Sequence, residues 1–166
     1  MEEKLDEAQN EFVERKERMQ NVIIFGVPES NVTHSKDRKK DEEMVHKICE
    51  NINAEAVVIE DSFRLGKFDH SKHSRPRPMK VKLKTKAMQQ DMLKNAENLA
   101  TSNDDVLKQC FLKPDMTKKE REERQKVVKE LKDREKSGET DLVIFRDRVV
   151  KRRPPRQANT ETKLQM

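Results

Sequence analysis

Tryptophan and tyrosine are absent from this 166-residue sequence, and phenylalanine occurs only six times. Hydrophobic residues make up 32% of the chain and charged residues 42%, whereas globular proteins average about 45–50% and about 25%. Such a chain cannot be built around one large core, so we expect a small core with solvated, helix-rich or extended parts. Three glycines and six prolines are too few for a loop-dominated or β-sandwich protein.

Long apolar runs are also missing, and none approaches the roughly 18 residues that a membrane-spanning helix needs. The first residues, MEEKLDEAQN, are typical of neither a secretory signal nor an Arg-rich transit peptide. Cys49 and Cys110 lie far apart, and we expect both to be reduced and to pack as small buried hydrophobes. These features favour a reducing compartment and no membrane partner.

Basic residues are clustered, although the net charge of +5 is modest. Residues 64–94 carry a net charge of +8 and residues 146–156 a net charge of +5, whereas residues 1–18 carry −3. Clustered positive charge indicates a polyanion-binding surface, most often for nucleic acid. Basic residues that only keep a small domain soluble are the alternative.

Residues 1–19 are predicted to form a helical stub. Leu5, Ala8, Phe12 and Met19 fall at heptad spacing, although Arg15 occupies one of the core positions. The pattern is typical of the last heptads of a coiled coil, and a solvated helical lead-in fits it equally well.

Residues 20–115 alternate between strand and helix patterns, which predicts an α+β domain. We expect strands at 22–27, 56–65, 79–84 and 106–113, and helices at 36–54 and 86–99, the second with Thr85 as N-cap. The order β-α-β-β-α-β is that of the split βαβ unit, which the RNA recognition motif shares with many other folds.

Residues 116–153 are predicted to form a small helix-plus-hairpin domain, followed by a disordered tail at 154–166. Thr117 and Glu120 have the spacing of a capping box, and the charged helix that follows should run to Lys136 and end at Ser137-Gly138. Apolar residues at 142–145 and 149–150 flank Arg146-Asp147-Arg148, which predicts a hairpin.

The central sheet should present one face to solvent. Met79, Val81 and Leu83 alternate with Lys80, Lys82 and Lys84, so the lysines should lie on the open face. From the other strands we expect that face to receive Ile23, Phe25, Phe111 and Lys113.

A lysine row binds phosphates without reading base identity, which predicts salt-sensitive, sequence-tolerant binding of single strands. An ordinary RNA recognition motif carries two or three stacking rings, whereas Ile23 and Lys80 occupy the two main positions here. Phe25 or Phe111 is expected to stack one base, at about 1–3 kcal/mol, with a packed core position as the alternative for Phe25.

Several segments resemble the first-open-reading-frame protein of LINE-type non-LTR retrotransposons. They occur in the family's order and are NVIIFGVPES (21–30), FRLGK (63–67), RPRPMKVKLKT (75–85), MLKNA (92–96), FLKPDMTKKEREER (111–124) and DLVIFRDRVVKRR (141–153). The resemblance implies a coiled coil that trimerises, an RNA recognition motif and a small C-terminal domain. It also implies a protein that coats its own transcript in cytoplasmic ribonucleoprotein particles and acts as a nucleic-acid chaperone on RNA and single-stranded DNA.

The same resemblance implies which residues contact RNA. Asn21 opens the first strand, where the family often has a polar residue. The implied basic contacts around the sheet are Arg64, Lys67, Arg75, Arg77 and Lys80, and those of the C-terminal hairpin are Arg146, Arg148, Lys151, Arg152 and Arg153. Two departures from the family pattern are the short coiled coil and the lack of a Cys-His zinc knuckle.

Catalytic signatures are scarce, so we expect no enzyme activity and no cofactor or metal. The sequence has no G-x-x-x-x-G-K-[ST] phosphate loop, and His70-x-x-His73 reads as a polar loop. The Lys151-Arg152-Arg153 run also fits a nuclear import signal. The alternative function is a protein-interaction scaffold, in which the N-terminal helix and the 117–136 helix dock partner helices.

Overall fold

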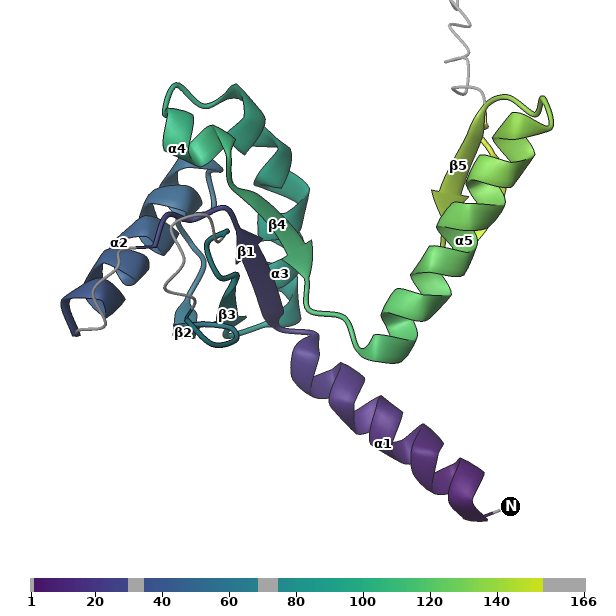
Figure 1. The fold of residues 1–166 in the computed structure, drawn as a ribbon, viewed down its shortest axis with the longest axis horizontal. Helices are drawn as coiled ribbons and strands as arrows, with labels where there is room; N and C mark the ends of the chain where they lie inside the picture. The colour runs from purple at the N-terminus through teal and green to yellow at the C-terminus, as the bar shows by residue number, and fades with distance from the viewer. Residues whose placement is uncertain (1, 30–34, 69–74, 154–166) are drawn as a thin grey trace, which may run out of the picture. The chain divides into compact units, whose positions relative to one another are not determined.

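The computed structural model describes residues 2–29, 35–68 and 75–153 (Figure 1). The chain forms two compact units, Met1–Thr117 and a second that begins at Lys118. This division lies two residues from the expected boundary at 115/116, and it groups the N-terminal helix α1 (Glu2–Arg18) with the central domain. The expected tail at 154–166 and the His70-x-x-His73 loop lie outside the described residues.

The first unit contains a four-stranded antiparallel sheet in the order β2-β3-β1-β4. Its strands are β1 (Asn21–Phe25), β2 (Ile59–Arg64), β3 (Met79–Leu83) and β4 (Phe111–Pro114). Helix α2 (Ser35–Asn51) connects β1 to β2, and α3 (Lys86–Asn95) follows β3. The predicted α+β class and the β-α-β-β-α-β order of the sheet and its two main helices are therefore confirmed.

One face of the sheet packs against these two helices. Met79, Val81 and Leu83 of β3 are fully buried, and they form one core with Val45 and Ile48 of α2 and with other residues of the first unit. Burying such a side chain is worth roughly 1.5–3 kcal/mol, so this alternation fixes the register of β3. The predicted inward direction of the apolar residues of β3 is confirmed.

The start of α3 also follows the prediction. The Thr85 hydroxyl accepts a hydrogen bond from the Met88 amide at 3.2 Å, as an N-cap does. The predicted single helix over 86–99 is instead divided into α3 and a 3₁₀ helix, η1 (Ala96–Thr101).

The predicted strand over 106–113 is wrong in its first half. The helical turn α4 (Asp105–Lys108) occupies this part, and the strand begins only at Phe111. The Asp104 carboxylate caps the turn by accepting hydrogen bonds from the amides of Val106 and Leu107, at 2.9 and 3.4 Å. A strong cap and the buried Leu107 outweigh the strand preference of this apolar run. The predicted strand over 56–65 also begins later, at Ile59.

The second unit consists of helix α5 (Lys118–Lys136) and a hairpin of β5 (Leu142–Phe145) and β6 (Arg148–Lys151). The helix starts and ends where the sequence predicts. Arg146 and Asp147 form the hairpin turn with φ values of +48° and +56°. Two successive left-handed residues are the conformation that a two-residue turn needs to match the twist of its strands.

Candidate nucleic-acid interface

Cross-strand pairing arranges the open face of the sheet in rows. Phe63 of β2 lies opposite Lys80 of β3, Lys80 lies opposite Ile23 of β1, and Ile23 lies opposite Lys113 of β4. Directly opposed residues of an antiparallel pair project from the same face. We call this set, Phe63–Lys80–Ile23–Lys113, the central row.

Beside the central row, Phe25 and Phe111 form a stacked aromatic pair. Their ring centroids are 4.9 Å apart with 7° between the ring planes, and the Lys113 ammonium lies 5.5 and 5.4 Å from the two centroids. Phe111 remains 48% exposed, whereas Phe25 is half-buried. The pair therefore offers one accessible aromatic ring with a cation beside it, which is the chemistry that binds a nucleobase next to its phosphate.

The Asp115 carboxylate occupies one end of this face and binds three donors. It lies 3.1 Å from the Arg18 guanidinium, 3.0 Å from the Asn21 amide nitrogen and 3.1 Å from the Lys80 ammonium. Asn21 and Ile23, both expected to contact RNA, are only 3% and 8% exposed. Both side chains are covered by their neighbours, so they are not available for contact with RNA at the surface of the sheet.

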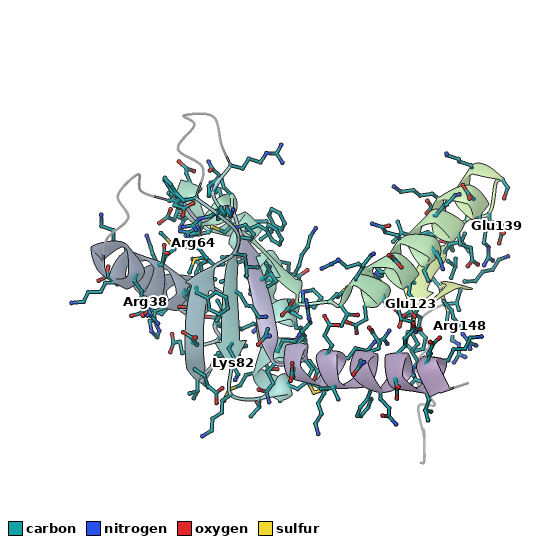
Figure 2. The ribbon with its side chains drawn as sticks, turned by 60° about the horizontal axis from the view of Figure 1, so that its bottom comes forward. Arg38, Arg64, Lys82, Glu123, Glu139 and Arg148 are labelled. Atoms are coloured by element: carbon teal, nitrogen blue, oxygen red, sulfur yellow. The ribbon has the colours of Figure 1, made fainter. Side chains whose placement is uncertain are left out.

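Arg64 lies on the opposite side of the sheet, between β2 and α2 (Figure 2). Its guanidinium forms a bidentate pair with Asp41, at 3.0 and 2.6 Å, and donates to the carbonyls of Val27, Pro28 and Arg77 at 2.9–3.0 Å. Only 7% of its side chain is exposed. All of these donors serve the fold, and the Arg64 side chain is not exposed on the open face of the sheet.

Arg77 is also held by internal partners. It pairs with Glu29 through two guanidinium nitrogens, donates to the Gly66 carbonyl at 3.0 Å and lies over the Phe68 ring. Burial by itself raises the pKa of the Glu29 carboxyl, but the hydrogen bonds from Arg77 outweigh burial and hold that pKa below its ordinary value. Arg77 therefore stabilises the loop ends next to β3.

Other basic residues of the first unit are exposed. Lys82 makes a long, exposed ion pair with Glu60 at 3.6 Å, which contributes little and is easily exchanged for a phosphate (Figure 2). Within the described part of the chain, no ion pair involves the exposed side chains of Lys67, Arg75, Lys84 or Lys113.

The hairpin of the second unit carries exposed basic residues at both ends of β6. Those expected from the sequence are all exposed, namely Arg146, Arg148, Lys151, Arg152 and Arg153. The Arg146 guanidinium lies 5.3 Å from the centroid of the Phe145 ring, which is 59% exposed. The hairpin thus has the cationic surface that the sequence predicts.

Two exposed aromatic residues were missing from the sequence-based set, Phe63 and Phe145. For Phe63 the signal was alternation, because Ser62 and Arg64 turn toward the helices and the residue between them must turn outward. For Phe145 the signal was its position next to the basic turn.

The thiols of Cys49 and Cys110 are buried and have low reactivity. Burial raises the pKa of Cys49 to about 11, and burial together with the charge of Asp104 raises the pKa of Cys110 above its ordinary value. At pH 8 a thiol with a pKa near 11 is ionised in only about one molecule in a thousand.

We therefore expect both cysteines to resist a thiol reagent in the native protein at pH 8. Addition of urea should expose both thiols and restore reaction at the rate of a free cysteine. Absorbance of the released thiolate from an aromatic disulfide reagent measures both rates. Rapid reaction of one thiol without urea would contradict the assigned burial.

The described residues form neither a metal-binding cluster nor a membrane-spanning helix. Among the described residues, no His, Cys, Asp and Glu side chains gather in a group of three that could hold a metal ion. No helix in the described ranges combines the length and apolar character needed to cross a membrane. In comparisons with known protein families and with curated proteins, nothing matches this chain.

Proposed function

We propose that this protein binds single-stranded RNA with little sequence preference, coats a transcript and acts as a nucleic-acid chaperone without enzyme activity. The observation that carries the proposal is the stacked Phe25–Phe111 pair beside Lys113, on a sheet face that also bears Lys80 and Lys82. The strand order and the open face support an RNA-recognition-motif-like fold for the first unit. Retrotransposon origin rests on the sequence resemblance.

The chemistry of the face favours binding over base readout. Stacking on Phe111 is worth about 1–3 kcal/mol for any base, because every base has a π-face. The Lys82, Lys84 and Lys113 ammonium groups are exposed and bind phosphates as point charges. Neither kind of contact distinguishes one base from another, so sequence-tolerant coating follows.

Salt titration tests the proposal. If Lys80, Lys82, Lys84 and Lys113 each neutralise one phosphate, log K should fall with log[salt] at a slope of about −3, since each single-strand contact contributes about −0.7. Affinity should then drop at least about 50-fold between roughly 50 and 200 mM salt. Fluorescence anisotropy with a labelled single-stranded RNA of about 30 nucleotides measures this.

A second RNA of unrelated sequence is the matched control, and it should give the same affinity and slope. A single-stranded DNA of the same length should bind similarly. Absence of binding at 50 mM salt would remove the basis for the proposal, and a strong preference for one RNA would contradict sequence tolerance.

Helix α1 exposes apolar side chains that favour contacts with other proteins. Leu5, Phe12 and Val13 are 61%, 68% and 53% exposed on this helix, and Leu5 and Phe12 share one face at a spacing of seven residues, as in a coiled-coil seam. We propose that it joins copies of the chain, as a trimer by family resemblance, in ribonucleoprotein particles of the cytoplasm and also of the nucleus. A scaffold that docks partner helices is the second candidate, and it predicts binding that is insensitive to salt.

A further inference from the structure

We infer that Phe63 is a second nucleobase platform, and that a bound single strand crosses the sheet along the central row. This inference rests on the proposed function and extends its site to the far edge of the sheet. Phe63 lies on the edge strand β2 and is 47% exposed. No packing role accounts for so much exposed ring, because its neighbours Ser62 and Arg64 provide the helix-facing contacts of β2.

The residue next to Phe63 in the central row is a lysine. Phe63 is opposite Lys80, whose ammonium has three N–H donors and contacts Asp115 at 3.1 Å. The remaining donors of Lys80 are therefore available for a phosphate. A ring and a lysine thus share the central row at the β2 edge, and at the β4 edge the Lys113 ammonium lies 5.4 Å from the centroid of the Phe111 ring.

The spacing of the two platforms suits a strand that crosses the sheet. Residues of one row advance by one strand spacing of about 4.8 Å, so β2 and β4 lie about 14 Å apart. The cations Lys80 and Lys113 alternate with Phe63 and Ile23 over that distance. A polyanion along this row meets the Phe63 ring on β2, Lys80 on β3 and, on β4, Lys113 beside the Phe111 ring of the next row.

Acidic side chains flank the central row on one side. The next row contains Asp61, Lys82 and Asn21, and the Asn21 amide is hydrogen-bonded to Asp115. Glu60 pairs with Lys82 beside it. These carboxylates make the potential around Lys82 less positive than that along the central row, whereas the Phe25–Phe111 pair lies on the other side of the central row and carries no acid.

The absence of tryptophan and tyrosine makes a direct test possible. In the full-length F63W variant, the introduced indole is the only tryptophan, so its emission reports position 63 alone. We expect a poly(U) oligonucleotide to quench this emission by base stacking. An abasic oligonucleotide of the same length supplies the phosphates alone and should leave the emission nearly unchanged. The matched control is F12W, because the Phe12 ring is 68% exposed on the acidic helix α1.

Affinity provides a second readout. F63A should weaken binding to poly(U) by about 5- to 150-fold, the equivalent of about 1–3 kcal/mol of stacking, and should leave binding to the abasic strand unchanged. If the wild-type protein binds but F63W is not quenched and F63A binds normally, the second platform is excluded and the proposed function stands. If the wild-type protein binds neither oligonucleotide at low salt, the proposed function itself fails.

Discussion

Replacing Arg64 with alanine is expected to lower the free energy of unfolding by about 3–5 kcal/mol. The side chain is 7% exposed and forms a bidentate pair with Asp41. Its removal leaves the Asp41 carboxylate and three backbone carbonyls without their donor. The loss exceeds the net value of the ion pair itself, because partly buried acceptors remain unsatisfied.

Urea unfolding followed by circular dichroism measures this loss. Arg38→Ala is the matched control, because Arg38 also pairs with α2 and β2 residues, Glu42 and Asp61, but through an exposed side chain. Its expected cost is below about 1 kcal/mol. An R64A variant that unfolds like the wild type but binds RNA weakly would return Arg64 to the interface and refute its structural role.

Gly26→Ala should destabilise the first unit by a similar amount, about 3–5 kcal/mol. Gly26 follows β1 with φ of +86°, and a Cβ at this position would lie 2.3 Å from the Gln109 carbonyl oxygen. The clash is with backbone, so no side-chain rotation relieves it, and the residues before β4 must move. The left-handed conformation adds roughly 1–2 kcal/mol for a residue with a Cβ.

Gly66→Ala separates these two contributions. Gly66 has nearly the same φ, +82°, but an added Cβ would meet no atom within 4 Å. Its expected cost is therefore about 1–2 kcal/mol, from backbone conformation alone. Thermal or urea unfolding of the two variants side by side measures the difference, and equal destabilisation would disprove the close approach of Gly26 to Gln109.

Local patterns predicted the elements well where one physical signal dominated. The alternation from Met79 to Leu83 identified which side of β3 is buried, and Thr85 identified the start of α3. The run from Val106 to Cys110 misled because its apolar residues fit a strand, whereas the cap at Asp104 makes it helical. In this segment the helix cap competes with the strand preference of the apolar residues. Tertiary packing decides which conformation forms, and a single sequence does not show that packing.

The candidate site was harder to predict than the fold. The family resemblance implied Arg64 as a nucleic-acid contact, and the sequence did not show that Asp41, 23 residues away, is its partner. The ion pair between Lys80 and Asp115 was likewise invisible in the sequence, because only the folded chain brings the two residues together. Strand alternation alone predicts the outward direction of Phe63, because Ser62 and Arg64 on either side of it face the helices.

The contacts of Asp115 have a mechanical consequence. Arg18 and Asp115 are 97 positions apart, yet their ion pair, together with the hydrogen bond from Thr117 to Glu11, joins the chain where it enters β1 to the chain where it leaves β4. Val22 lies opposite Pro114, so β1 and β4 are neighbours that a pulling force grips at the same end. A force that pulls the chain before β1 away from the chain after β4 would break these polar contacts first. It would then break the hydrogen bonds between β1 and β4 one at a time. This geometry is that of unzipping, in which the hydrogen bonds between β1 and β4 break one after another and not all at once.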